Sequence, residues 1–292
     1  MPRILIIGKN SFIGKNYREY SKNSSIDEVD AKQYKPEELN FEGYDVVLHL
    51  AAIVHQSGNI GLEEYTRVNT HLPVALAEQA KMAGVGQFIF MSTSKVYGKY
   101  NPAMGSWTED SPCSPANYYG ISKLRAELEL LKLNDISFQV SIIRTPMVYG
   151  RGVKANMLSL IKLVDGLPLL PFKRVNNRRS LTFAGNLAAY IDRIIELKTQ
   201  GVFIAMDAYS PSTEELIVSI AAALGKNTRL FSPGRLALNL GKHFFRGYYE
   251  RLYLDEVLDN TKTLELLSFT PPYSLEEGMA DTISSYLQLK EK

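Results

Sequence analysis

The chain has 292 residues, and its 33 lysines and arginines nearly balance its 31 aspartates and glutamates, leaving a formal net charge of +2. This balance excludes a whole-chain basic surface for nucleic acid or an anionic membrane, so an anionic ligand must be bound by a local cluster of charge. Cys113 is the single cysteine, which excludes an intrachain disulfide, and the four histidines lack metal-ligand spacing, so we expect no metal.

The first predicted element is a buried strand at Ile4 to Ile7, close to the N-terminus. Its apolar run is too short for a signal peptide or a membrane span, so we expect a cytoplasmic protein without a stable membrane anchor. Similar runs follow at 45–50, 87–91 and 139–143. Runs of this kind are typical of strands that are buried on both faces of a parallel sheet.

Helical patterns separate these strands, at 63–83 and at 118–133. Strands that alternate with helices predict an α/β fold with a doubly wound parallel sheet of the Rossmann type. In such sheets the ligand binds at the carboxyl ends of the strands. We therefore expect the functional residues in the turns that follow the predicted strands.

The character of the sequence changes after Gly150, where proline, glycine and basic residues become frequent. Shorter helices are predicted at 186–198 and 212–224, and a longer one at 274–290. The apolar run at 201–206 predicts a strand that returns to the main sheet. We divide the chain into a larger domain, 1–150, and a smaller C-terminal α/β lobe, 151–292, of which about 186–206 rejoins the larger domain, so that the two are interwoven.

A loop between the first strand and the following helix has the composition of a dinucleotide-phosphate loop. Glycine allows the backbone to approach a pyrophosphate, and the helix N-terminus offers free amides and the positive end of its dipole. The middle position of the usual three-glycine pattern is Ser11, whose amide and hydroxyl are still available. We predict a cofactor contact for Gly8, Asn10, Ser11, Phe12, Ile13 and Gly14.

Cofactor choice depends on an acid just past the second strand, where a carboxylate holds the adenosine ribose and repels a 2′-phosphate. Asp30 is the best placed, and Asp27 competes with it because the intervening strand is short and poorly apolar. This pattern favours NAD and leaves NADP open. Residues 1–150 are accordingly predicted to form the NAD(P)-binding domain.

Tyr119 and Lys123 lie four positions apart on a predicted helix and so share one face. An ammonium beside a phenol stabilises the phenolate and suits tyrosine to proton transfer. The turn Ser92 to Ser94 follows a predicted strand, where its hydroxyls can bond a reacting oxygen or cap a helix.

These motifs resemble those of the extended short-chain dehydrogenase/reductase family, also called the NAD-dependent epimerase/dehydratase family. Beyond the phosphate loop, the similar segments are HLAA at 49–52, STSKVYG at 92–98, YGISK at 119–123 and RTPMVYG at 144–150. The chain is most similar to bacterial nucleotide-sugar 4-epimerases and UDP-4-keto-6-deoxy-N-acetylhexosamine 4-reductases, through VYGRGVKANMLSLIKLVDGLPLLPF and NNRRSL.

The resemblance implies a role for several residues. Thr93 would be the catalytic hydroxyl, Tyr119 the acid/base, and Lys123 its partner and a ribose ligand. The implied cofactor contacts also include Leu50, Ala51, Ala52 and Asn69. The implied substrate contacts are Thr93, Ser94, Met147, Arg179 and Arg251, with Arg179 at the diphosphate and Met147 where many epimerases carry an asparagine.

The implied activity is an NAD(P)-dependent oxidation or reduction at carbon 4 of a nucleotide sugar, expected to be UDP-linked, during bacterial surface-polysaccharide synthesis. Both 4-epimerase and 4-keto-reductase remain open. A 4,6-dehydratase would carry an acidic pair after Thr93, but Ser94 and Lys95 stand there. The alternative is a non-catalytic NAD(P)-binding sensor or scaffold. Relatives also suggest a homodimer through 63–83 and 118–133.

Overall fold

The fold comes from a computed structural model that describes residues 1–31, 35–54, 60–99, 105–234, 242–244 and 246–291. A six-stranded sheet, with every neighbouring pair parallel, has the order β2-β1-β3-β4-β5-β9. Its strands are β1 (Ile4–Ile7), β2 (Ile26–Val29), β3 (Val46–His49), β4 (Gln87–Thr93), β5 (Gln139–Thr145) and β9 (Gly201–Ile204). The direction of winding reverses between β1 and β3, so the predicted doubly wound Rossmann sheet is confirmed.

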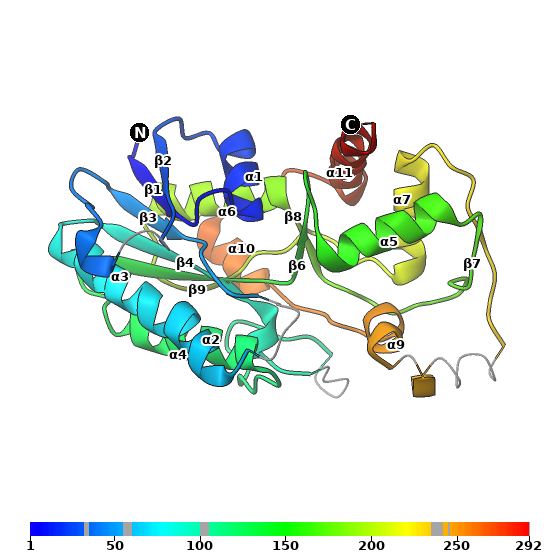
Figure 1. The fold of residues 1–292 in the computed structure, drawn as a ribbon, viewed down its shortest axis with the longest axis horizontal. Coiled ribbons are helices and arrows are strands. Elements are labelled where there is room, and N and C mark those ends of the chain that lie inside the picture. The colour runs from blue at the N-terminus through cyan, green and yellow to red at the C-terminus, as the bar shows by residue number, and fades with distance from the viewer. Residues whose placement is uncertain (32–34, 55–59, 100–104, 235–241, 245, 292) are drawn as a thin grey trace.

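Helices cover both faces of this sheet (Figure 1). One face carries α1 (Phe12–Tyr20) and α6 (Ala184–Leu197), and the other α2 (Leu62–Thr66), η2 (Arg67–His71), α3 (Leu72–Met82) and α4 (Tyr118–Leu131). Successive strand residues point to opposite faces, so Ile4 and Ile6 pack towards α6 while Leu5 and Ile7 pack towards α3. This burial on both faces explains the uninterrupted apolar runs.

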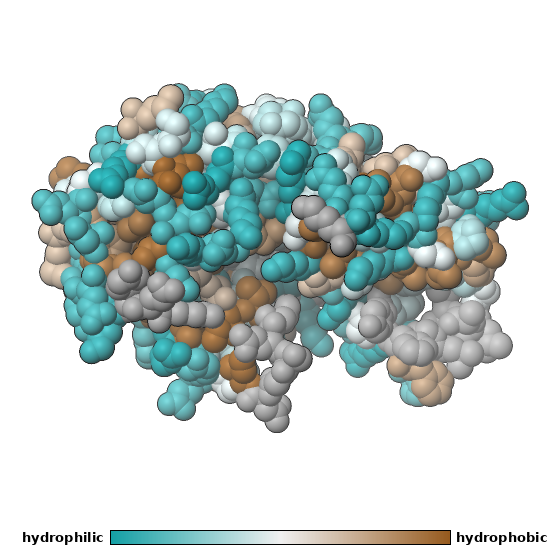
Figure 2. All heavy atoms as spheres, turned by 45° about the horizontal axis from the view of Figure 1, so that its top comes forward, coloured by the Kyte–Doolittle hydropathy of each residue, from teal (hydrophilic) through white to brown (hydrophobic). Residues whose placement is uncertain are grey.

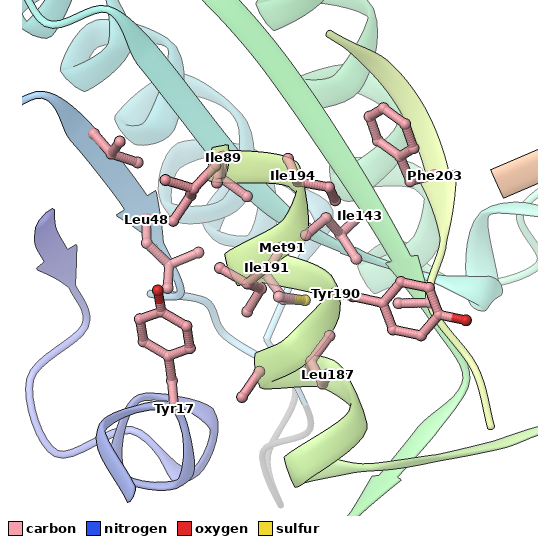
Figure 3. Close-up of a cluster of buried hydrophobic side chains, with 14 of the residues drawn as sticks. Tyr17, Leu48, Ile89, Met91, Ile143, Leu187, Tyr190, Ile191, Ile194 and Phe203 are labelled. Carbon is pink, nitrogen blue, oxygen red and sulfur yellow. The ribbon is translucent and has the colours of Figure 1, made fainter. Parts of the chain in front are cut away.

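The core beneath α6 is drawn in Figure 3. Ile191 and Ile194 of α6 project towards Ile89 and Ile143 from the neighbouring strands β4 and β5. All four side chains are fully buried. Each such isoleucine stabilises the fold by about 1.5 to 3 kcal/mol relative to an exposed one. This packing joins α6, from the second half of the chain, to the main sheet.

The helix predicted over 63–83 differs from a regular α-helix in the middle. Residues Arg67–His71 form one π-helical segment between α2 and α3. Pro73 has no N–H to donate to the carbonyl of Asn69, so the regular ladder cannot pass this point. Single π turns of this kind are frequent at functional sites, and this one contains Asn69, a predicted site residue.

The smaller lobe has its own core, beside the main sheet in Figure 1. Its helices are α5 (Ala155–Gly166), α7 (Thr213–Ala223), α9 (Arg246–Tyr253) and α11 (Leu275–Lys290), and its paired strands are β6 (Met147–Tyr149) with β8 (Leu181–Phe183) and β7 (Leu169–Leu170) with β10 (Arg229–Leu230). Helix α10 (Thr261–Leu267) contacts α6, and the short 3-10 turns are η1 (Pro36–Glu38) and η3 (Ser94–Val96).

The chain passes from this lobe back to the main sheet, since α6 and β9 follow β8. The lobes are therefore interwoven, whereas the boundary at residue 150 stays a prediction. Hydrophilic side chains occupy much of the face seen in Figure 2, with apolar patches between them. Within the described ranges, no helix is both long and apolar enough to cross a membrane.

Candidate active site

The phosphate loop closes against the segment that follows β3. Gly8 has a φ of +131°, which L side chains rarely adopt, and a Cβ there would lie 3.0 Å from the amide nitrogen of Ala51. The carbonyl of Ile7 accepts hydrogen bonds from the amides of Leu50 and Ala51 at 2.8 and 2.9 Å. Gly8, Leu50 and Ala51 thus form one backbone cradle at the switch point of the sheet, the place where doubly wound folds bind their ligands.

Ser11 stands where the usual three-glycine pattern has its middle glycine. It is the N-cap of α1, and its hydroxyl accepts a hydrogen bond from the amide of Gly14 at 3.1 Å. A Cβ on Gly14 would lie 2.7 Å from that hydroxyl, so this glycine is needed for the cap. Asn10 has a φ of +61°, a conformation that asparagine tolerates better than most residues. Phe12 and Ile13 pack against the two hydrophobic cores.

Of the two competing acids, Asp30 follows the last residue of β2, at the carboxyl edge of the sheet. Asp27 pairs in register with Leu5 and accepts hydrogen bonds from Arg3 at 3.1 Å and Tyr44 at 2.8 Å. The side chain of Asp27 is therefore held by these two neighbours at the surface, where it is 52% exposed. The position of Asp30 agrees with the predicted ribose contact.

Asn69 connects the cofactor segment to the catalytic helix. Its side-chain oxygen accepts from the amide of Ile53 at 2.8 Å, and its nitrogen donates to the carbonyl of Ile53 at 2.9 Å and to the hydroxyl of Ser122 at 3.1 Å. All of the Asn69 side chain is buried. It therefore fixes the backbone immediately after Ala52 relative to the helix that carries Tyr119 and Lys123.

Thr93 and Tyr119 are brought together by the close approach of α4 to the end of β4. Gly120 makes this possible, because a Cβ there would lie 2.5 Å from the carbonyl oxygen of Lys95. The Thr93 side chain hydrogen-bonds Tyr119 and accepts from the amide of Lys95 at 3.3 Å. Burial raises the pKa of Tyr119 to about 12, although the bond from Thr93 lowers it. The phenol is therefore protonated at neutral pH.

Lys123 lies one turn further along α4 and is only 2% exposed. Its ammonium donates to the carbonyl oxygen of Met91 at 2.7 Å and lies 4.1 Å from the ring centroid of Phe90. Burial lowers the pKa of Lys123 to about 7, while the carboxylate of Glu127 raises it. An ammonium has three N–H groups, so the Met91 bond leaves donors for further partners.

Behind Lys123 lies a buried ion pair that the sequence reasoning missed. Glu127, one further turn along α4, bonds Arg144 of β5 at 2.7 Å and accepts from the hydroxyl of Ser92. Arg144 also donates to the hydroxyl of Tyr97 at 3.0 Å. The spacing of Glu127 from Lys123 is a visible signal, whereas the contact with Arg144 has no local signature.

The predicted substrate contacts Ser94 and Arg179 both bond a residue that the sequence did not suggest, Glu256. Arg179 donates to one carboxylate oxygen of Glu256 at 2.6 Å. The other oxygen accepts from Lys95 at 2.5 Å and from the hydroxyl of Ser94 at 3.2 Å. Burial alone would raise the pKa of Glu256, but Lys95 and Arg179 hold it below its usual range. A buried carboxylate therefore joins the smaller lobe to the turn after β4, Thr93 to Val96, which is called the catalytic turn below for its predicted role.

The other two predicted substrate residues lie apart from this cluster. Met147 begins β6 and packs against the core of the smaller lobe. Arg251 lies on α9, and its guanidinium donates to the side chain of Asn156 at 2.9 Å. Among the residues described, no group of histidine, cysteine, aspartate or glutamate side chains is arranged to hold a metal ion.

Comparison with known proteins matches residues 4–204 to the NAD dependent epimerase/dehydratase family. A UDP-glucose 4-epimerase from Vibrio cholerae is 37% identical over 265 residues, covering 87% of this chain and 80% of the relative. A dTDP-glucose 4,6-dehydratase from Streptomyces griseus is 38% identical over 256 residues, covering 84% of this chain and 72% of the relative.

Among solved structures, MoeE5 in complex with UDP-glucuronic acid and NAD superposes with a TM-score of 0.74 at 22% identity, covering 98% of this chain and 99% of the other. At this identity the likeness supports the fold alone. The family match, which spans the sheet and the predicted catalytic residues, carries the assignment. The chain belongs to the NAD-dependent epimerase/dehydratase family of extended short-chain dehydrogenases/reductases.

Proposed function

We propose that the chain is an NAD(P)-dependent nucleotide-sugar oxidoreductase that acts at carbon 4 of a UDP-linked hexose or N-acetylhexosamine, as a 4-epimerase. The observation that carries this proposal is the hydrogen bond between Thr93 and Tyr119, with Lys123 one turn further along the same helix. The relative from Vibrio cholerae that is named a UDP-glucose 4-epimerase supports the choice of reaction. The 4-keto-reductase shares the same proton and hydride transfer at carbon 4.

The bound nicotinamide would supply or accept the hydride at the sugar carbon. Tyr119 gives a proton to the oxygen on carbon 4 when the carbonyl is reduced and takes it back when the alcohol is oxidised. Thr93, which hydrogen-bonds the phenol, orients it and polarises the reacting oxygen. Lys123 in its charged form stabilises the phenolate and offers N–H donors to the cofactor ribose.

The residues after Thr93 weigh against dehydration, despite the relative named a dTDP-glucose 4,6-dehydratase. Loss of water needs an acid and a base at the neighbouring carbons. Ser94 and Lys95 occupy the positions after Thr93, and both bond Glu256. A non-catalytic sensor has no need for Tyr119 and Lys123 on one helix face beside Thr93, so we favour catalysis over a scaffold.

The test is to supply the purified protein with UDP-glucose and UDP-N-acetylglucosamine and follow the sugar by NMR. An epimerase converts each sugar to its carbon-4 epimer without added NAD(P)H in stoichiometric amounts. A 4-keto-reductase consumes NAD(P)H and acts only on a 4-keto sugar nucleotide. No turnover of any of these sugar nucleotides, with cofactor bound, would overturn the proposed function.

A further inference from the structure

Glu256 occupies an unusual position, between the catalytic turn and the segment before β8. Its backbone is fixed on both sides, because its amide donates to the carbonyl of Arg178 at 2.9 Å and its carbonyl accepts from the amide of Ser180 at 2.8 Å. Its side chain is 8% exposed and therefore cannot rotate freely into solvent. The carboxylate is held at a defined point beside the catalytic turn.

Two cations share this single carboxylate. Arg179 binds Oε2 at 2.6 Å and is 14% exposed, while Lys95 binds Oε1 at 2.5 Å and is 38% exposed. Among these three residues, two positive charges meet one negative charge. In a chain that is nearly neutral overall, this is a local cationic site of the kind that an anionic ligand requires.

Lys95 is the more accessible of the two cations, and it lies two residues after Thr93, the predicted catalytic hydroxyl. Its own amide bonds Thr93, so the backbone of Lys95 is part of the catalytic turn. Arg251, predicted as a substrate contact, bonds Asn156 on α5. Of these two residues, Lys95 is the one that belongs to the cluster around Arg179.

We propose that Lys95 is a substrate-binding cation, oriented by Glu256, that binds an anionic oxygen of the substrate beside the catalytic turn. The identity of the substrate rests on the proposed function, whereas the anion site rests on the cluster itself. The anionic oxygen belongs either to the diphosphate or to a carboxylate on the sugar. Both sources present an anionic oxygen, and the experiment distinguishes them by comparing ligands that carry one, the other or both.

The experiment titrates the full-length protein by calorimetry with NADH at saturation, so that the phosphate loop is occupied. The ligands are pyrophosphate, uridine, UDP, UDP-glucose and UDP-glucuronic acid. The variants are Lys95→Met, Lys95→Arg and, as a matched control, Lys262→Met, whose lysine is exposed and bonds Asp110. If the anionic oxygen belongs to the diphosphate, Lys95→Met weakens pyrophosphate and UDP at least about tenfold; if it belongs to a sugar carboxylate, only UDP-glucuronic acid is weakened that much. Uridine binding stays within about twofold in both cases.

Lys95→Arg keeps the charge and should restore most of the affinity, which a purely structural defect would not allow. Weakening confined to UDP-glucuronic acid would place the anion on the sugar. If Lys95→Met binds every ligand as tightly as the wild type does, or if the wild type binds none of them, the proposal of an anion site at Lys95 is wrong. Pyrophosphate binding that depends on Lys95, without turnover of any UDP-sugar, would overturn the proposed function and keep the site.

Discussion

Asn69 exchanges two hydrogen bonds with the backbone of Ile53, accepting from its amide at 2.8 Å and donating to its carbonyl at 2.9 Å. The same side chain donates to Ser122 on the catalytic helix. One buried amide therefore sets the distance between the cofactor segment after β3 and the helix that carries Tyr119 and Lys123.

Replacing Asn69 with alanine is expected to weaken NADH binding about tenfold, because the segment after Ala52 loses its anchor. Leaving the partly buried amide and carbonyl of Ile53 without their Asn69 partner should also lower the free energy of unfolding, by about 1 kcal/mol. Fluorescence titration and urea denaturation measure the two effects. Asn260→Ala is the matched control, since Asn260 is buried and bonds Tyr190, away from the cradle. Equal loss of NADH affinity in both variants would argue against this role.

Asp30 is expected to select NAD. Asp30→Ser should weaken NAD and strengthen NADP, changing the ratio of their dissociation constants at least about tenfold, because the carboxylate that repels a 2′-phosphate is gone. Asp27→Ser should leave the ratio unchanged, since Asp27 bonds Arg3 and Tyr44. A change in the ratio with Asp27→Ser but not with Asp30→Ser would show that Asp27, and not Asp30, contacts the ribose.

The charge of Lys123 is expected to govern activity near neutral pH. Its pKa is about 7, below the ordinary value of 10.5, so the ammonium is present below pH 7 and is lost as the pH rises through that value. Glu127 is the carboxylate that faces it, and His49, whose burial lowers its pKa to about 3, stays neutral. We expect kcat/KM to fall above about pH 7.

Lys123→Arg provides the control for this prediction, because a guanidinium keeps its charge across the whole range. The variant should be slower than the wild type but should lack the alkaline decline. If the pH profile of Lys123→Arg falls at the same pH as that of the wild type, the titrating group is another residue.

The Glu127 and Arg144 pair is expected to be important for stability. Glu127→Ala leaves a buried guanidinium unpaired and should lower the free energy of unfolding by about 3 to 5 kcal/mol. Glu64 and Arg67 form an exposed pair at 2.6 Å, and Glu64→Ala should lower the free energy of unfolding much less, because solvent screens the pair. Urea denaturation of both variants measures the difference, and equal losses would show that burial of the first pair adds nothing.

Much of the fold could be predicted from the sequence because its strands are buried on both faces. The runs at Ile4 to Ile7 and 139–143 are apolar without interruption, and helical spacing between them leaves few alternatives to a doubly wound sheet. The predicted return of 201–206 followed from another such run, and β9 pairs with β5 in the structure. The π segment was not predicted, although Pro73 marks where the regular ladder fails.

The site residues likewise fall into those that local sequence patterns suggest and those that they do not. Tyr119 and Lys123 are neighbours on one helix, and Gly8 to Gly14 form one loop, so local spacing is enough to suggest them. Glu256 and Lys95 are 161 positions apart, and no pattern in either segment indicates that they meet. Contacts of this kind depend on how the smaller lobe packs against the sheet, which periodicity does not determine.

Tyr119 tests the central claim most directly. Tyr119→Phe keeps the ring and removes only the hydroxyl that Thr93 orients, so NADH and UDP should bind as in the wild type. Conversion of the UDP-sugar that the wild type epimerises, followed by NMR, should be slower by at least about 100-fold, since the proton donor at carbon 4 is missing. Turnover by Tyr119→Phe at the wild-type rate would contradict the account.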